Sequence, residues 1–334
     1  MTREQAAEAL EEILAGRVPE VETAALLTVL AARGELAPEL AGFVDTMRKH
    51  SVPMPFPEAE RADLVDCVGT GGGGPQTFNI SCGAALVASA AGAKVAKHGN
   101  RAVTSRCGAA DVLEALGVPI ELDPALAVEC VRETGFVFLY APLYHPAMKV
   151  LGPLRRALGF RTIFNLVGPL TNPAHARTQV IGVLAPSRVL LVGRTLAALG
   201  AKRAFVVHGT DGIDELTTTD ESVVARVEES PSGEIQLKAA RITPEMAGLP
   251  RTTLDHFIGG DIAMNKALLC DVLTGIPGAR REIVLLNAAA VLVAAGLAGD
   301  LKEGVAVGAE AIDSGQAAAT LEKLRRFAAK HNAK

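Results

Sequence analysis

A glycine-rich run directly after an apolar segment is the feature that most constrains this chain. The short apolar run at 64–68 predicts a buried strand, and five of the next six residues, 69–74, are glycines. Glycine has no Cβ, so it adopts positive φ and lets successive backbone N–H groups point at one ligand. Ser81 is expected to open a helix whose N-terminal amides add partial positive charge. The segment predicts an anion site, and a tight strand-to-helix turn is the plainer alternative.

The charge around this run favours the anion site. Residues 67–110 contain no Asp or Glu, although the 334-residue chain has 37 carboxylates, so roughly five would be expected there. The same stretch carries Lys94, Lys97, Arg101 and Arg106. Cations without carboxylates are typical of a segment that binds phosphate.

Two common nucleotide motifs do not fit the run. Residues 69–74 satisfy G-x-G-x-x-G, but a dinucleotide site requires an acidic residue about 20 positions further on. The next predicted strand leads into Lys97 and His98 instead. No GK[ST] follows the glycines, which excludes a P-loop for nucleoside triphosphates.

Apolar segments of strand length alternate with Ala-rich helical segments after residue 63. The strands are expected at 64–68, 93–96, 136–139, 179–184 and 204–207, with a polar hairpin at 223–240. This alternation predicts an α/β domain with a mainly parallel central sheet. The segment 144–173 interrupts it with a helix at 146–159 and a turn at Gly168–Pro169.

Three short helices are expected before the first strand. Thr2 caps the first, Pro19 begins the second, and the third follows Pro38. Residues 51–57, with three prolines, read as a linker. Three such helices bury little by themselves, so they must pack on the larger domain or on another subunit.

Composition argues against several other classes of protein. The net charge of −4 gives no general attraction to nucleic acid or to anionic lipid, and a chain without Trp and with two Tyr offers no stacking platform. The five cysteines form no C-x-x-C pair, which favours reduced thiols. Residues 1–20 lack the pattern of a signal peptide and no apolar run is long enough for a membrane span, so we expect a cytoplasmic protein.

Eight blocks of sequence, in order along the chain, resemble the anthranilate phosphoribosyltransferase family. They are DCVGTGG at 66–72, TFNIS at 77–81, KHGNRAVTS at 97–105, HPAMK at 145–149, RRALGFRTIFNLVGPLTNP at 155–173, HGTDGIDEL at 208–216, GGDIAMN at 259–265 and LLNAAAVL at 285–292. The resemblance implies transfer of the 5-phosphoribosyl group from phosphoribosyl pyrophosphate to the amine of anthranilate, with pyrophosphate as the second product. This is the second step of tryptophan synthesis from chorismate.

The same resemblance implies a fold and an assembly. A small N-terminal helical domain at 1–62, rejoined by the returning segment 144–173, would stand beside a larger α/β domain at 63–334 of the nucleoside phosphorylase and phosphoribosyltransferase type. The substrates would lie between the two. A homodimer through the helical domain is implied, with no nucleic-acid or membrane partner.

Most of the implied site residues surround phosphoribosyl pyrophosphate. By resemblance, the residues that bind this substrate are Gly69, Gly72, Gly73, Thr77, Asn79, Ile80, Ser81, Cys82, Lys97, His98, Gly99, Asn100, Arg101, Ala102, Val103, Thr104, Ser105 and Ala109. No dedicated general base is implied. Breaking the bond from the ribose C1 to pyrophosphate builds charge on both fragments, so stabilisation of the transition state is assigned to Lys97 and Arg101.

A smaller set of residues is implied for magnesium and for anthranilate. The adjacent carboxylates Asp214 and Glu215, with the hydroxyl of Ser81, match the family's Mg²⁺ ligands, and hard oxygen donors suit that ion. Gly69, Asn100 and Arg155 match the anthranilate contacts, since the acceptor's carboxylate requires a cation.

The chain departs from the family pattern around the phosphate loop. Gly73, Cys82 and Met264 stand where the family usually has Asp, Thr and Glu. Cys82 is either acidified by nearby amides and Lys97 or a buried inert thiol. Two rival functions are weighed: a pyrimidine nucleoside phosphorylase, whose K-x-S-G-R-G signature is absent, and a non-catalytic nucleic-acid-binding paralogue, which should be strongly basic and lack the Asp214–Glu215 pair.

Overall fold

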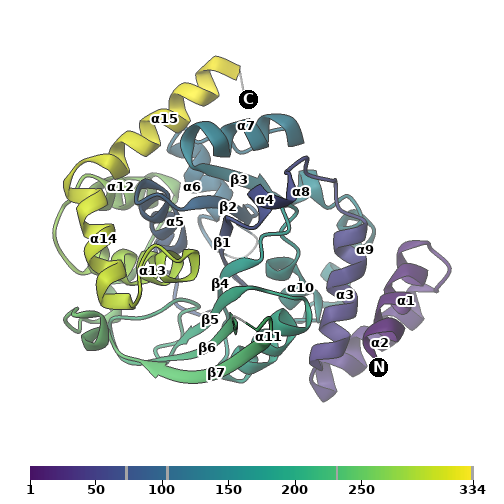
Figure 1. The fold of residues 1–334 in the computed structure, drawn as a ribbon. Coiled ribbons are helices and arrows are strands. Elements are labelled where there is room, and N and C mark those ends of the chain that lie inside the picture. Colours follow the sequence, from purple (N-terminus) through teal and green to yellow (C-terminus); the bar gives the residue numbers. More distant parts are fainter. Residues whose placement is uncertain (72–73, 103–104, 231, 332–334) are drawn as a thin grey trace.

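The computed structural model describes residues 1–71, 74–102, 105–230 and 232–331. These residues form one sheet, whose strands are β1 (Leu64–Gly69), β2 (Lys94–Gly99), β3 (Phe136–Tyr140), β4 (Thr178–Gly182), β5 (Arg203–Gly209), β6 (Ser222–Glu229) and β7 (Ile235–Ile242). The strand order is β3-β2-β1-β4-β5-β6-β7 (Figure 1). β1 to β5 are parallel, and β6 and β7 are antiparallel to their neighbours. The predicted mainly parallel sheet is confirmed.

Helices lie on both sides of this sheet (Figure 1). One apolar core contains side chains of α5 (Ile80–Ala90), α6 (Ala109–Ala115), α7 (Pro124–Thr134), α12 (Ile262–Leu273), α13 (Ala279–Ala295), α14 (Leu301–Asp313), α15 (Gln316–His331) and the 3₁₀ turns η1 (Pro244–Ala247) and η2 (Leu254–Phe257). A second core contains side chains of α1 (Arg3–Leu14), α2 (Glu20–Arg33), α3 (Ala37–Lys49), α9 (Met148–Leu158), α10 (Phe164–Leu170) and α11 (Pro186–Ala198). The short helices α4 (Glu58–Arg61) and α8 (Ala141–Tyr144) complete the order.

Strand β5 shows how one sheet serves two cores. Phe205 and Val207 pack into the first core, whereas Ala204 and Val206 pack into the second. Successive side chains of a strand point to opposite faces, so a strand covered on both faces is apolar throughout. This is why the strands read as short continuous apolar runs.

The N-terminal helices share their core with the returning segment. Phe43 of α3 and Phe164 of α10 pack with ring centroids 5.6 Å apart, and Arg48 of α3 donates hydrogen bonds to the carbonyl of Leu170. Both helical parts therefore belong to one layer. The division of the chain at residue 62, with 144–173 rejoining the helical part, stays a prediction.

Most local signals at the helix ends are as expected, and one is wrong. The Thr2 side chain accepts a hydrogen bond from the Gln5 amide at 3.2 Å, which confirms the first cap. The turn expected at Gly168–Pro169 is instead part of α10. Proline lacks an N–H, so α10 loses one backbone hydrogen bond at Pro169 and ends one residue later. Helix α5 begins at Ile80, one residue before the expected Ser81.

The strand order places a switch point between β1 and β4. β2 follows β1 on one side of it, whereas β4 lies on its other side. In open α/β sheets, ligands bind outside the carboxyl ends of the strands at such a point. Within the described ranges, no helix is both long enough and apolar enough to span a membrane.

Candidate active site

The glycine-rich loop begins at the carboxyl end of β1, beside the end of β4. Gly69 and Gly182 are the last pair in the register of these strands, and the Thr70 amide donates to the Gly182 carbonyl at 2.9 Å. Gly71 has φ of +55°, where glycine is favoured. The loop therefore leaves the sheet at the switch point. Gly72 and Gly73 lie outside the described residues.

Asp214 lies directly against this loop. Its Oδ2 accepts a hydrogen bond from the Gly71 amide at 3.1 Å. A Cβ on Gly69 would lie 2.5 Å from the same oxygen, and a Cβ on Gly182 would overlap the Asp214 carbonyl oxygen. Both strand ends must be glycine for the carboxylate to approach this closely. The structure thus brings the predicted phosphate loop and the predicted metal carboxylates together.

The pair Asp214–Glu215 is electrostatically strained without a cation. Burial raises the pKa of Asp214, and burial together with the charge of Asp214 raises the pKa of Glu215 well above its usual value. Glu215 Oε2 is buried, and no described residue hydrogen-bonds to it. A bound cation lowers the pKa values of both residues, because it stabilises both ionised carboxylates.

These donors fit a magnesium ion. Mg²⁺ takes oxygen ligands and is usually held by one or two carboxylates together with water and substrate phosphates. The described residues contain no group of three or more His, Cys, Asp and Glu side chains that could hold a metal. The remaining ligands of an ion at Asp214 and Glu215 must therefore come from hydroxyls, water or substrate.

Lys97 connects strand β1 with the first turn of α5. It lies on β2 with its side chain almost fully buried, and its Nζ donates to the Cys67 carbonyl and, at 3.3 Å, to Ser81 Oγ. Burial works to lower the pKa of Lys97, but neighbouring groups, among them Asp66, outweigh it and raise the pKa. The ammonium is therefore charged, and it lies next to the predicted metal ligand Ser81.

Cys82 takes the second of its two predicted forms. Its side chain is fully buried, and burial raises the pKa of its thiol although Lys97 works in the opposite direction. A thiolate is the reactive species, so this cysteine is an inert core residue rather than an acidified one.

The loop after β2 is organised around Asp111. This carboxylate accepts from the amides of Ala102 and Gly108, each at 2.9 Å, and it pairs with Arg101, which also pairs with Glu114. The guanidinium of Arg101 is thus turned to two carboxylates. No sequence signal pointed to this pairing. Of the two cations assigned to the transition state, Lys97 is the one that contacts Ser81 at the start of α5.

The remaining predicted residues of this loop are placed as follows. Asn100 Oδ1 accepts a hydrogen bond from the Arg101 amide at 2.8 Å, and a Cβ on Gly99 would meet the Phe138 ring at 2.9 Å. Ser105 Oγ donates to the Cys107 carbonyl at 3.5 Å. Ala109 is the first residue of α6. Val103 and Thr104 lie outside the described residues.

One side chain that was not predicted, Asn265, contacts the segment that precedes α5. Asn265 of α12 donates from Nδ2 to Asn79 Oδ1 at 2.9 Å, and its Oδ1 accepts from the Gly260 amide at 2.7 Å. Thr77 forms an isolated bridge with Ile258. The block GGDIAMN therefore supports the segment that leads into Ile80 and α5. Its likeness to the family pattern was the available signal.

His98 is neutral in this structure. Its amide donates to Asp66 Oδ1 at 3.0 Å, and its ring packs edge-on against His145 with centroids 5.0 Å apart. Burial, and then the neighbouring His145, lower the pKa of His98 well below its usual value. An uncharged ring can orient a substrate but does not add positive charge.

Arg155 is the cation on the helical side. It lies on α9, half-buried, with its guanidinium 5.7 Å from the centroid of the Phe164 ring. Burial lowers the pKa of Arg155. No carboxylate among the described residues pairs with it. An unpaired, partly desolvated guanidinium is suited to a carboxylate ligand.

A helical bundle beside an α/β domain, with a glycine loop at the switch point, defines a glycosyl transferase of the class that two family models describe. The model "Glycosyl transferase family, helical bundle domain" matches residues 1–51, and "Glycosyl transferase family, a/b domain" matches residues 61–318. An anthranilate phosphoribosyltransferase from Rhodopseudomonas palustris is 48% identical over 97% of this chain and 93% of its own length. One from Moorella thermoacetica is 44% identical over 97% and 93%.

Solved structures agree with these relatives. Anthranilate phosphoribosyltransferase from Thermus thermophilus superposes with a TM-score of 0.89 at 43% identity, covering 98% of this chain and 95% of that one. The Saccharomyces cerevisiae enzyme in complex with PRPP and Mg gives a TM-score of 0.86 at 26% identity, covering 98% and 94%. The chain belongs to the anthranilate phosphoribosyltransferase family of glycosyl transferases.

Proposed function

We propose that this chain transfers the 5-phosphoribosyl group of phosphoribosyl pyrophosphate to the amine of anthranilate. The products are N-(5-phosphoribosyl)anthranilate and pyrophosphate, which makes the reaction a step of tryptophan synthesis. The observation that carries the proposal is the contact of Asp214 with the Gly71 amide at the switch point. The relatives that are named anthranilate phosphoribosyltransferase support the same reaction. It unites an anion loop with carboxylates suited to a metal.

The chain's own groups account for departure of the leaving group. As the bond from C1 to the pyrophosphate oxygen breaks, pyrophosphate takes the electron pair and gains negative charge. Lys97 and the amides of the glycine loop stabilise that charge without proton transfer. Arg101 was predicted to help, but its guanidinium pairs with Asp111 and Glu114 in this structure.

We assign magnesium to Asp214 and Glu215, with Ser81 as a further ligand. The support is the buried, unpartnered Oε2 of Glu215 and the presence of Mg in the yeast relative's complex with PRPP. When bound, the ion neutralises the developing charge on pyrophosphate. The chain holds the two carboxylates in place for it.

Arg155 orients the acceptor. Its guanidinium has no carboxylate partner in the described chain. It can therefore form an ion pair with the carboxylate of anthranilate. Asn100 and Gly69 are assigned to the same substrate. The amine nitrogen then faces C1 and forms the new bond as the old one breaks. The nitrogen gives up one proton to solvent, so the chain contributes positioning rather than a dedicated base.

One assay tests reaction and acceptor together. Pyrophosphate release is measured with phosphoribosyl pyrophosphate and Mg²⁺ present, and anthranilate, aniline and benzoate are compared as acceptors. Of the three acceptors, we expect only anthranilate to be turned over, because aniline lacks the carboxylate and benzoate lacks the amine. Turnover of aniline at the rate of anthranilate, or no turnover of anthranilate, would refute the assignment.

We further propose that the chain acts as a cytoplasmic homodimer joined through its helical domain. Val21, Ala25 and Val29 form an exposed apolar stripe on α2, with Val21 74% and Val29 59% exposed. Residues four apart share one face of a helix. Light scattering of the parent and of Val29→Glu tests this, because a charge on the stripe should yield monomers. A monomeric parent would contradict the proposal.

A further inference from the structure

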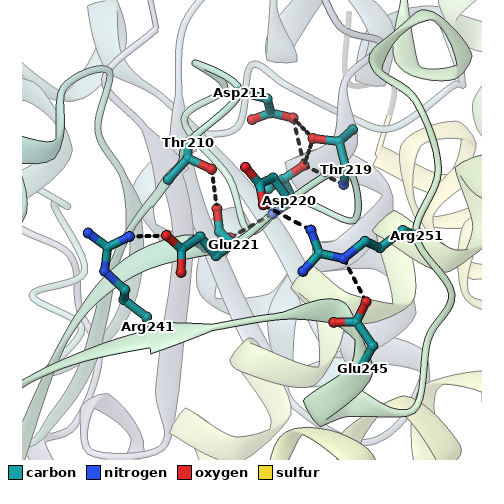
Figure 2. A network of polar contacts seen from close by, with 10 residues as sticks. Thr210, Asp211, Thr219, Asp220, Glu221, Arg241, Glu245 and Arg251 are labelled. Carbon is teal, nitrogen blue, oxygen red and sulfur yellow. Dashed lines mark hydrogen bonds and ion pairs between the residues drawn. The ribbon is translucent and has the colours of Figure 1, made fainter.

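The segment between β5 and β6 carries Asp214 and Glu215 but forms no helix or strand. Carboxylates that bind a metal require fixed backbone positions, since small displacements weaken coordination. Figure 2 shows the polar contacts of this segment, in which Asp211 and Thr219 point toward one another. Two sets of hydrogen bonds restrain it.

The first restraint is the carboxylate of Asp211. Its Oδ2 accepts from Thr217 Oγ1 at 2.6 Å and from Thr219 Oγ1 at 2.7 Å, and its Oδ1 accepts from the Ile213 amide at 3.4 Å. Thr217 and Thr219 follow the pair Asp214–Glu215 in sequence, whereas Ile213 precedes it. A single carboxylate therefore ties together the chain before and after the pair.

Asp211 is not held by any cation among the described residues. The nearby guanidiniums are committed elsewhere (Figure 2): Arg251 pairs with Asp220 and Glu245, and Arg241 pairs with Glu221. Its negative charge therefore remains available to the site.

The second restraint comes from a distant helix. Asn287 of α13 is buried; its Oδ1 accepts from the Leu216 amide at 3.0 Å, and its Nδ2 donates to the Leu216 carbonyl at 2.8 Å. Leu216 directly follows Glu215. A side-chain amide is suited to this two-way contact, because it offers a donor and an acceptor side by side.

We propose that Asp211 and Asn287 are positioning residues, which hold the backbone of Asp214 and Glu215 so that both carboxylates face the divalent cation that accompanies the diphosphate. The inference rests on the proposed function, in which this pair binds Mg²⁺. Neither residue touches the reacting atoms. Their loss should weaken the binding of the Mg²⁺ complex of phosphoribosyl pyrophosphate and leave the acceptor side unchanged.

Calorimetric titration of each variant with phosphoribosyl pyrophosphate and Mg²⁺, without anthranilate, measures this binding in the absence of turnover. Asp211→Ala and Asn287→Ala should each weaken it by about tenfold, as the loss of groups that orient metal ligands does elsewhere. Asp211→Asn should restore most of the affinity, because its amide bonds to hydroxyls that can rotate. Thr219→Val, which removes one of the two hydroxyls, should give an intermediate loss. The KM for anthranilate should stay at the parental value throughout.

Asp220→Ala is the matched control. It removes an exposed carboxylate from the same segment, and Asp220 pairs with Arg251 rather than with Asp211's partners, so its affinity should equal the parent's. The proposal is overturned if folded Asp211→Ala binds as the parent does while Asp214→Asn/Glu215→Gln does not. If that double variant also binds normally, the metal assignment fails instead. Should Asp211→Ala not fold, parental affinity of Thr219→Val overturns the proposal.

Discussion

The carboxylate of Asp214 accepts a hydrogen bond from the backbone amide of Gly71 at 3.1 Å. An amide suited to a phosphate oxygen is thus occupied by an anion of the chain itself. Under the proposed function, a bound cation would pair with the carboxylate and a bound diphosphate would accept from the amide. Neither group is left unpaired in either state, which keeps the cost of the exchange low.

Replacing the carboxylate pair should abolish catalysis without unfolding the protein. We expect Asp214→Asn/Glu215→Gln to lose roughly a hundredfold or more in kcat/KM at limiting Mg²⁺, since metal stabilisation of the leaving group is worth several kcal/mol. The melting temperature should be unchanged or higher, because two buried like charges are removed. Asp220→Asn serves as the control. Parental turnover of the double variant would rule out the metal role.

Arg155 should act on the acceptor alone. Arg155→Ala is expected to raise the KM for anthranilate by on the order of tenfold to a hundredfold, the value of a hydrogen bond to a charged group. The KM for phosphoribosyl pyrophosphate should change little. Arg156→Ala, at the exposed neighbouring position on α9, is the control in steady-state kinetics. Equal effects of Arg155→Ala on both constants would contradict the assignment.

The fold was largely predictable, because its signals are local. The apolar run expected at 204–207 is the centre of β5, Arg203–Gly209, and the cap at Thr2 is present. Residue contacts at the site are not local. Asn79 and Asn265 are separated by 186 positions, and no periodicity links them. Arg101 was predicted to bind phosphate because the carboxylates that pair with it lie on α6, beyond the stretch that lacks Asp and Glu.

The buried Asp66 should give the protein a pH-dependent stability. Burial raises its pKa to about 6 in the folded chain, whereas an unfolded Asp titrates near about 4. The folded state therefore holds the proton more tightly, so this contribution to stability is present at low pH and is lost as the pH rises from about 4 to about 6. The shift corresponds to about 3 kcal/mol.

Urea unfolding of the parent and of Asp66→Asn between pH 4 and pH 7 measures this contribution. The variant's amide can still accept from the His98 amide but does not titrate, so its free energy of unfolding should rise relative to the parent's by up to about 3 kcal/mol across the range. Asp63→Asn, at an exposed position, should run parallel to the parent. Parallel curves for Asp66→Asn as well would show that Asp66 titrates normally in the folded chain.

Gly182 should be intolerant of any side chain. A Cβ there would overlap the Asp214 carbonyl oxygen, and backbone cannot rotate away as the end of a side chain can. Gly182→Ala should therefore push the Asp214–Glu215 segment off the end of β4 and reduce kcat/KM at limiting Mg²⁺ by about tenfold or more. Gly152→Ala is the matched control, because a Cβ at that position of α9 meets only the end of Arg156 at 3.5 Å, and alanine favours a helix over glycine. Circular dichroism and thermal melting of both variants establish that they fold. A folded Gly182→Ala with parental Mg²⁺ dependence would show that the carboxylate pair does not need its close approach to the strand end.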